Sequence, residues 1–222
     1  MIYRFVKRVF DVVCALLGII ITSPIWIVSI ILTEISDPGP LFYCANRVGK
    51  DSKRFKMWKF RSMRVARSAN EVSLRPEQER IFWWGKMMRR LKIDELPQLL
   101  NILNGTMSIV GPRPAAVDQV DVTRGGENAC AAKLPCGLTS PSSLYDYIYG
   151  DQFEDETEYN EKVLPTRLKL DVWYVYKIEK SNSFVAWWYD IKLIWWTVWA
   201  IVLIAVGKYP QWLYNYLVRL VK

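Results

Sequence analysis

An acidic pair lies at the predicted start of a helix, and an arginine enclosed by two prolines follows it. The pair is Asp94 and Glu95, and the arginine is Arg113, between Pro112 and Pro114. The amino end of a helix carries free amides and partial positive charge, which suits a phosphate or a carboxylate. Two adjacent carboxylates could share a divalent cation, or one could attack phosphorus while the other orients metal and substrate. These residue types indicate phosphate chemistry, with Asp94 and Glu95 as candidate catalytic and metal-binding residues.

The same local sequence also fits a purely structural role. Asp94 occupies a position suited to an N-cap, and Glu95 would favour the helix dipole. Apolar residues at helical spacing predict a helix over 96–103, which Asn104-Gly105 would end. Both interpretations of the pair stay open on local sequence alone.

Four nearby cations are candidate phosphate-binding residues. Lys59 and Arg61 lie two residues apart in an extended segment, so their side chains share a face on which a diphosphate could bind. Arg89 lies in the basic segment 85–91 that comes before the acidic pair, and the prolines around Arg113 fix its backbone for presenting a guanidinium to phosphate. The alternatives are contacts with anionic headgroups for the first two, a solvated basic helix for Arg89 and a tight structural turn at Arg113.

The composition excludes several mechanisms. The 222 residues contain no histidine, which excludes an imidazole base, a Ser-His-Asp triad and a His-ligated zinc site. The four cysteines show no paired spacing, so we expect free thiols in a reducing compartment. A net charge of +8 indicates an anionic partner, and eleven tryptophans with twelve tyrosines favour a membrane surface.

The amino-terminal apolar segment is long enough to enter a bilayer, with twenty-two uncharged residues between Asp11 and Glu34. Ser23-Pro24 falls near its middle, where proline removes a backbone hydrogen bond and bends a helix. Basic residues, including Arg8, lie on both sides, so a simple span would violate the positive-inside rule. A re-entrant helix-break-helix satisfies both clusters, with the Ser23 hydroxyl available to a freed carbonyl. A single kinked span is the alternative.

The remaining chain predicts a small α/β domain with short strands at 41–43 and 54–60. Residues 68–80 are expected to form a surface loop or short helix, and residues 119–132 an irregular loop. From Trp187 onward, an apolar face at helical spacing predicts a helix in the membrane interface; a core helix or one tilted into the bilayer is the alternative.

The predicted organisation is therefore a membrane-associated α/β protein in three parts. Residues 1–36 form the re-entrant membrane hairpin, 37–184 the cytosolic catalytic domain and 185–222 the aromatic-rich interfacial helices. Within the middle part, Asp171 lies among apolar and aromatic residues, where a buried acid needs a partner.

Five blocks of the chain together resemble a known family. The segment DELPQLLNILNGTMSIVGPRP is similar to the signature of the bacterial sugar transferases, the monotopic phosphoglycosyl transferases. Further blocks match in order: KRVFDVVCALLGIIITSPIWI, DPGPLFYCANRVGKDSKRFKMWKFRSM, GKMMRRLKIDE and LKLDVWYV. The segment PCGLTSPSSLYDYIYGD, from Pro135, departs from the pattern of many members, which leaves sugar or nucleotide specificity open.

This resemblance implies transfer of a sugar 1-phosphate from a UDP-sugar to a polyprenol phosphate such as undecaprenyl phosphate, with release of UMP, at the start of glycan assembly. It implies that Asp94 is the nucleophile of a covalent intermediate and that Glu95 assists through Mg²⁺ or a proton. It also implies phosphate clamping by Lys59, Arg89 and Arg113.

The resemblance further implies that Asp171 braces the site, by pairing with one of the arginines. It implies the same amino-terminal hairpin, which places the protein at the bacterial inner membrane with the catalytic domain on the cytoplasmic face. Membrane lipids are expected partners, nucleic acid is not, and a homo-oligomer is compatible with the sequence. A non-enzymatic basic membrane adaptor and a nucleic-acid-binding membrane protein are the alternative classes.

Overall fold

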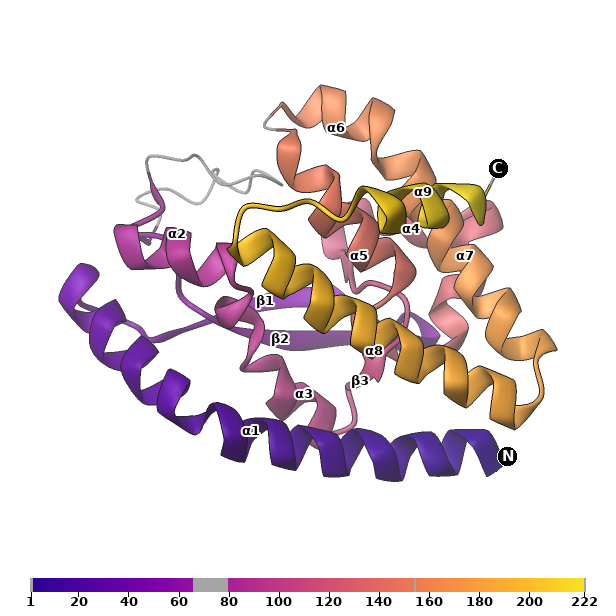
Figure 1. Cartoon of the computed structure of the whole chain (residues 1–222), viewed down its shortest axis with the longest axis horizontal. Helices are drawn as coiled ribbons and strands as arrows, with labels where there is room; N and C mark the ends of the chain where they lie inside the picture. Colours follow the sequence, from indigo (N-terminus) through magenta and orange to yellow (C-terminus); the bar gives the residue numbers. More distant parts are fainter. Residues whose placement is uncertain (1, 66–79, 154, 222) are drawn as a thin grey trace.

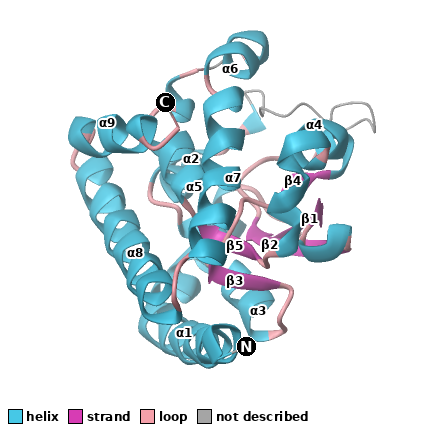
Figure 2. Cartoon of the chain, turned by 90° about the vertical axis from the view of Figure 1, so that its right-hand side faces the viewer, coloured by secondary structure: helices cyan, strands magenta, loops and turns pink. Residues whose placement is uncertain are grey.

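A long amino-terminal helix runs along one side of a mixed α/β body in the computed structural model, which describes residues 2–65, 80–153 and 155–221 (Figure 1). This helix is α1 (Ile2–Ser36), and α8 (Ser183–Ala205) lies beside it (Figure 2). Strands lie inside the body and helices cover them. The mixed α/β class predicted from the sequence is confirmed.

Two small sheets form the strand layer. β1 (Phe42–Val48) pairs antiparallel with β2 (Arg54–Phe60) on one side and with the short β4 (Ala115–Ala116) on the other. β3 (Met107–Val110) and β5 (Cys136–Thr139) pair in parallel. Both predicted strands exist, although β1 is longer than the predicted segment 41–43.

The remaining helices of the described residues are short apart from one. They are α2 (Trp83–Arg90), α3 (Gln98–Leu103), α4 (Val120–Arg124), α5 (Pro141–Ile148), α6 (Glu156–Lys162), α7 (Leu164–Lys180) and α9 (Gln211–Arg219). Short 3₁₀ turns lie at Lys50–Ser52, Ile93–Glu95, Val117–Gln119, Gly126–Lys133 and Gly150–Gln152.

Two predictions of secondary structure, for residues 96–103 and 119–132, are wrong. The helix predicted over 96–103 begins at Gln98, and Asp94 is not its N-cap, because the acidic pair lies in the separate turn Ile93–Glu95. Residues 119–132, predicted as an irregular loop, are helical in α4 and in the turn that follows it. The predicted loop 68–80 lies outside the described residues except for Arg80.

α1 is a single helix that contains Pro24, and its axis turns along its length in Figure 1. The expected helix-break-helix is thus corrected to a continuous helix with a proline bend. Pro24 has no amide hydrogen to donate to the carbonyl of Ile20. The Ser23 hydroxyl donates to this carbonyl at 2.8 Å, which confirms the predicted use of Ser23 and explains how the bend avoids an unpaired backbone group.

Polar contacts hold the first half of α1 to the body. Arg8 donates to the carbonyls of Ile102 (2.5 Å) and Leu103 (2.9 Å), which are among the last carbonyls of α3; the Ile102 carbonyl also accepts from the Gly105 amide at 3.1 Å. The Asp11 carboxylate accepts hydrogen bonds from the Ser108 hydroxyl at 2.7 Å and the Ile109 amide at 3.0 Å. Arg8, on the amino-terminal helix α1, therefore also caps the carboxyl end of α3.

A buried ion pair joins α1 to α8. Lys7 Nζ lies 2.7 Å from Asp190 Oδ2, and the hydroxyls of Tyr3 and Tyr174 donate to the same carboxylate at 2.7 Å each. A buried carboxylate requires this number of partners to offset its lost hydration. The three donors come from α1 and α7, so Asp190 joins three helices.

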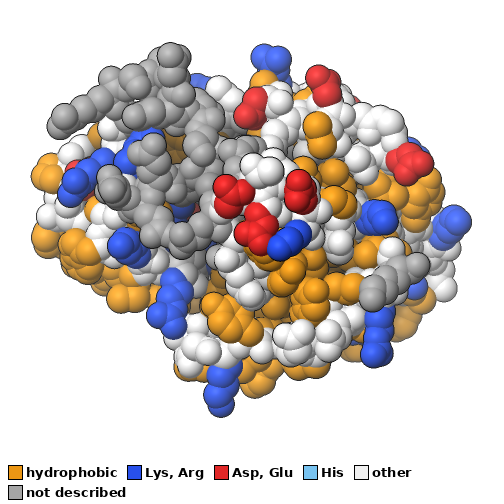
Figure 3. Space-filling model, turned by 90° about the horizontal axis from the view of Figure 1, so that it is seen from above, with side chains coloured by type: hydrophobic (Ala, Val, Ile, Leu, Met, Phe, Trp, Pro, Cys, Tyr) orange, Lys and Arg blue, Asp and Glu red, His pale blue; other side chains and the backbone are white. Residues whose placement is uncertain are grey.

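The outer faces of α1 and α8 are apolar and exposed. On α1 the most exposed side chains include Phe5 (72%) and Ile21 (73%), and on α8 Phe184 (73%) and Trp195 (68%). Both helices are long and apolar enough to cross a membrane. The face seen from above in Figure 3 carries acidic and basic side chains among apolar ones. Membrane association through α1 and α8 is consistent with this distribution.

α8 also packs against the body along its inner face, where Leu193 and Ala200 are fully buried. The helix predicted from Trp187 thus exists and is longer than expected. One face of α8 packs in the core, as the alternative prediction had it, and the other face exposes aromatic side chains.

Asn101 couples α3 to β2. This side chain is 1% exposed, accepts a hydrogen bond from the Trp58 amide at 2.9 Å and donates to the Lys56 carbonyl at 2.8 Å. The amide thereby replaces a neighbouring strand at this edge of the sheet. It fixes the helix that follows the acidic pair relative to the strand that carries Lys59.

We predict that Asn101→Ala lowers the free energy of unfolding by about 1–3 kcal/mol, because it leaves a buried amide and carbonyl unpaired. Asn104→Ala is the matched control, since Asn104 is exposed on the same segment and bonds only within its own turn. Thermal unfolding in detergent measures both. Equal losses for the two variants would contradict the coupling role of Asn101.

Candidate active site

The turn Ile93–Glu95 sets the acidic pair between α2 and α3. Lys92 enters this turn in the left-handed region, with φ 56° and ψ 21°, and its carbonyl accepts a hydrogen bond from the Glu95 amide at 3.2 Å. A non-glycine residue in this region is strained and is held there by its surroundings. The turn therefore has a fixed shape that presents two consecutive carboxylates to one neighbouring strand.

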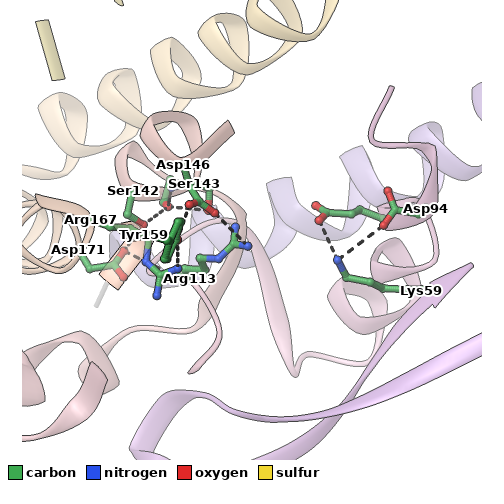
Figure 4. Close-up of polar contacts among 11 residues, drawn as sticks. Lys59, Asp94, Arg113, Ser142, Ser143, Asp146, Tyr159, Arg167 and Asp171 are labelled. Atoms are coloured by element: carbon green, nitrogen blue, oxygen red, sulfur yellow. Dashed lines mark hydrogen bonds and ion pairs between the residues drawn. The ribbon is translucent and has the colours of Figure 1, made fainter. Parts of the chain in front are cut away.

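Lys59 on β2 lies between the two carboxylates (Figure 4). Its Nζ is 2.9 Å from Glu95 Oε1 and 3.8 Å from Asp94 Oδ2. Asp94 is only 5% exposed, and among the described residues its Oδ1 has no hydrogen-bond partner. A buried carboxylate oxygen without a partner is unusual in a folded protein and is free to meet a ligand.

The two carboxyl groups ionise differently. Burial raises the pKa of Asp94, and Lys59 only partly opposes this effect. Burial also disfavours ionised Glu95, but the charges of Lys59, Lys92 and Arg113 outweigh it and lower the pKa to about 2. Glu95 is therefore the firmly ionised partner of Lys59, and Asp94 is the more basic oxygen of the pair, as a nucleophile requires.

Arg89 and Arg61 have different positions in the site. Arg89 Nε donates to the Ser62 hydroxyl at 2.8 Å, and the Arg89 charge acts to lower the pKa of Asp94. Arg61 is 5% exposed, and its guanidinium bonds to the carboxylate and carbonyl of Asp37 and to the carbonyl of Pro40. The structure thus brings Lys59 to the acidic pair, whereas the contacts of Arg61 hold the turn after α1.

Arg113 belongs to a second polar group beside the acidic pair (Figure 4). Its Nη2 lies 3.3 Å from Asp146 Oδ2, and 37% of its side chain is exposed. Asp146 accepts a hydrogen bond from the Tyr159 hydroxyl, which in turn accepts one from Arg167 at 2.6 Å. Because Arg113 lowers the pKa of Glu95, the two polar groups share one electrostatic field.

Asp171 holds the backbone of the Pro112-Arg113 segment. Its Oδ1 accepts hydrogen bonds from the Arg113 amide at 3.2 Å and the Ser142 hydroxyl at 2.6 Å. The Gly137 amide donates to the Pro112 carbonyl at 3.0 Å. The brace predicted for Asp171 therefore reaches the backbone of Arg113 instead of a guanidinium. Burial raises the pKa of Asp171, although the nearby Arg124 opposes this.

Sequence reasoning did not single out Lys92, Asp146, Tyr159 or Arg167. Lys92 stands two residues before Asp94 and was visible as one more cation in the basic stretch. Asp146 and Tyr159 lie about fifty or more residues further on, and no local pattern marks them. Only the packing of α5, α6 and α7 brings their side chains to Arg113.

The acidic pair fits a Mg²⁺ ion that is shared with a substrate. In the ranges that the structure describes, no group of three or more His, Cys, Asp or Glu side chains could hold a metal. Mg²⁺ commonly takes one or two carboxylates, retains water and completes its shell with substrate phosphates. Asp94 and Glu95 supply two carboxylates, and the unpartnered Oδ1 of Asp94 suits such a ligand.

Several known proteins are similar in sequence to this chain. UDP-glucose:undecaprenyl-phosphate glucose-1-phosphate transferase of Escherichia coli (strain K12) is 33% identical over 198 residues, 88% of this chain and 40% of the relative. A putative undecaprenyl-phosphate N-acetylgalactosaminyl 1-phosphate transferase of Bacillus subtilis is 44% identical over 113 residues, 50% of this chain and 63% of the relative. The exopolysaccharide production protein ExoY of Sinorhizobium fredii is 34% identical over 171 residues, 69% of this chain and 76% of the relative.

The chain thus spans less than two thirds of the length of the first two relatives and about three quarters of the third. The family model described as "Bacterial sugar transferase" matches residues 2–203, from the start of α1 almost to the end of α8. This range contains the acidic pair, Lys59 and the Arg113 group. The chain belongs to the bacterial sugar transferase family.

Proposed function

We propose that this protein transfers a sugar 1-phosphate from a UDP-sugar to undecaprenyl phosphate and releases UMP. The observation that carries the proposal is the buried Asp94 carboxylate, with one oxygen unpartnered, beside ionised Glu95 and Lys59. Relatives named for transfer of glucose 1-phosphate to undecaprenyl phosphate and for exopolysaccharide production support the substrate class and a role in glycan assembly.

The reaction would proceed in two displacements at the phosphorus that carries the sugar. A carboxylate oxygen of Asp94 forms a bond to this phosphorus, the bond to the bridging oxygen breaks, and its electron pair leaves with UMP. A phosphate oxygen of the polyprenol phosphate then attacks the same phosphorus and releases Asp94 as a carboxylate. Covalent catalysis divides one difficult meeting of two anions into two easier steps.

The other residues would neutralise and orient phosphate. Lys59 places a positive charge between the two carboxylates, which allows an anionic substrate to approach them. Arg89 and Arg113 would bind phosphate oxygens, and Asp171 would hold the Arg113 backbone in place. Mg²⁺ held by Asp94, Glu95 and phosphate oxygens would supply further charge neutralisation when bound.

We also propose that α1 is re-entrant and returns to the cytoplasmic face of the inner membrane. At about 1.5 Å per residue, a 35-residue helix is about 52 Å long, well beyond a bilayer core of about 30 Å. Yet Arg8, near its start, contacts α3, and Asp37, just after its end, binds Arg61 after β2. One body that holds both ends supports a helix whose ends share a side of the membrane.

The first prediction from the proposed function concerns the nucleophile. Asp94→Asn should lower UMP release by roughly a thousandfold or more, the scale seen when a covalent enzyme loses its nucleophile. The assay supplies nanodisc-held protein with Mg²⁺, undecaprenyl phosphate and a panel of UDP-sugars. Asp51→Asn, on an exposed turn, is the matched control and should retain native activity. Full activity of Asp94→Asn would overturn the mechanism, and UMP release with one sugar alone would identify the donor.

The second prediction concerns pH. Lys59 lowers the pKa of both Asp94 and Glu95, so Lys59→Met should raise both. Asp94 would then stay protonated to a higher pH, and the acid limb of the kcat/KM profile should move upward. Lys86→Met, an exposed cation on α2, serves as the control and should leave the limb in place. An unmoved acid limb in Lys59→Met would count against ionised Asp94 as the reacting group.

The third prediction concerns topology. An epitope tag before Met1 should be protected from protease in intact spheroplasts, because a re-entrant α1 keeps its amino end in the cytoplasm. Pro24→Ala should straighten α1 and make part of the tag accessible. Pro210→Ala, at the start of α9, is the matched control. Digestion of the tag on the native chain would show a single span and reject the re-entrant arrangement.

A further inference from the structure

A group of arginines lies beside the acidic pair, and two of its members have no role in the reaction described above. β1 carries Arg47, whose neighbour across the sheet is Ala116 on β4, three residues beyond Arg113. Arg113 and Arg167 are connected through Asp146 and Tyr159 (Figure 4). Strand pairing and helix packing therefore bring segments that carry Arg47, Arg113 and Arg167, distant in sequence, to the same region of the fold.

The guanidinium of Arg47 is poorly satisfied. Its Nε is buried, and within the described ranges it has no hydrogen-bond partner. Burial lowers the pKa of Arg47, and the like charges of Arg113 and Arg167 lower it further, whereas Tyr43 and Asp118 act in the opposite direction. A guanidinium that has lost water and faces like charges is unfavourable unless an anion completes its surroundings.

Several carboxylates of the described residues lie near this cluster: Asp118 acts on Arg47, and the charge of Arg167 acts on Asp171. Asp146 makes an ion pair with Arg113, and the Tyr159 hydroxyl stands between Asp146 and Arg167. Asp146 is 8% exposed, and the charges of Arg113 and Arg167 hold its pKa low in spite of burial, so it stays ionised. Asp146 and Tyr159 thus position two of the arginines, whereas Arg47 forms no ion pair with a carboxylate in the part of the chain that the structure describes, and its Nε has no hydrogen-bond partner there.

We propose that Arg47, Arg113 and Arg167 form an anion subsite for the phosphate that stays with the nucleoside when the sugar phosphate is transferred. This assignment rests on the proposed function. Arginine forks match the geometry of phosphate oxygens, and in Figure 4 Arg113 lies on the side of its polar group that faces Lys59 and Asp94. The phosphate of the departing nucleotide gains negative charge as the bridging bond breaks, and a fixed cationic cluster favours that change.

The test measures binding of UMP to nanodisc-held protein by calorimetry, with uridine as the ligand that lacks phosphate. Arg47→Gln should weaken UMP binding about tenfold or more, the effect of removing a charged hydrogen-bond donor, and should leave uridine binding unchanged. Arg47→Lys should recover part of the loss. Arg54→Gln removes an exposed arginine from the adjacent strand and should bind UMP as the native chain does.

Thermal unfolding provides a readout that is independent of turnover. UMP should raise the Tm of the native chain and of Arg54→Gln more than that of Arg47→Gln, because a ligand stabilises the form to which it binds. Without ligand, Arg47→Gln should be at least as stable as the native chain, since it removes an unpaired buried charge. Arg167→Gln is the second variant and should also weaken UMP binding.

Inorganic phosphate and undecaprenyl phosphate distinguish the possible results. If Arg47→Gln weakens undecaprenyl phosphate binding and leaves UMP binding intact, the subsite serves the acceptor and the assignment is overturned. If the native chain binds phosphate through Arg47 but does not bind UMP, the anion subsite stands and the UDP-sugar donor is wrong. If no anion depends on Arg47, the inference is wrong whatever the reaction.

Discussion

The ion pairing of one lysine with two consecutive carboxylates is the contact around which the site is arranged. Lys59 meets Asp94 and Glu95 only because β2 and the turn after α2 are held at a fixed distance. Asn101 provides that constraint by bonding β2 to α3, and the strained backbone of Lys92 fixes the turn. Lys59 lowers the pKa of both carboxyl groups. Glu95 therefore stays ionised, whereas burial keeps Asp94 the more basic of the two.

The attachment of α1 links this site to the exposed apolar surface of α1 and α8. Arg8 bonds to the end of α3, so the same short helix is tied to β2 on one side and to α1 on the other. The buried Asp190 joins α1, α7 and α8. Both apolar helices are thus fixed to the body that carries the acidic pair.

Local patterns predicted much of this arrangement. Strand-forming runs around Phe42 and Phe55 gave real strands, and the Ser23-Pro24 step gave a bend whose freed carbonyl is satisfied as expected. Patterns failed where tertiary contacts compete with local preference. Asp94 resembles an N-cap, but Lys59 binds it from another element and the helix begins later. The two-residue spacing predicts that Arg61 and Lys59 share one face of a strand. In the structure Arg61 instead forms an ion pair with Asp37.

The sequence by itself determined the family, the acidic pair, the apolar helices and the absence of any imidazole chemistry, because these depend on residue types and short spacings. Only the tertiary structure decided which charges meet. Asp146, Tyr159 and Arg167 reach Arg113 through helix packing, and strand pairing places Arg47 opposite Ala116, three residues beyond Arg113. Electrostatic energy depends on distance and burial, and neither can be read from positions along a chain.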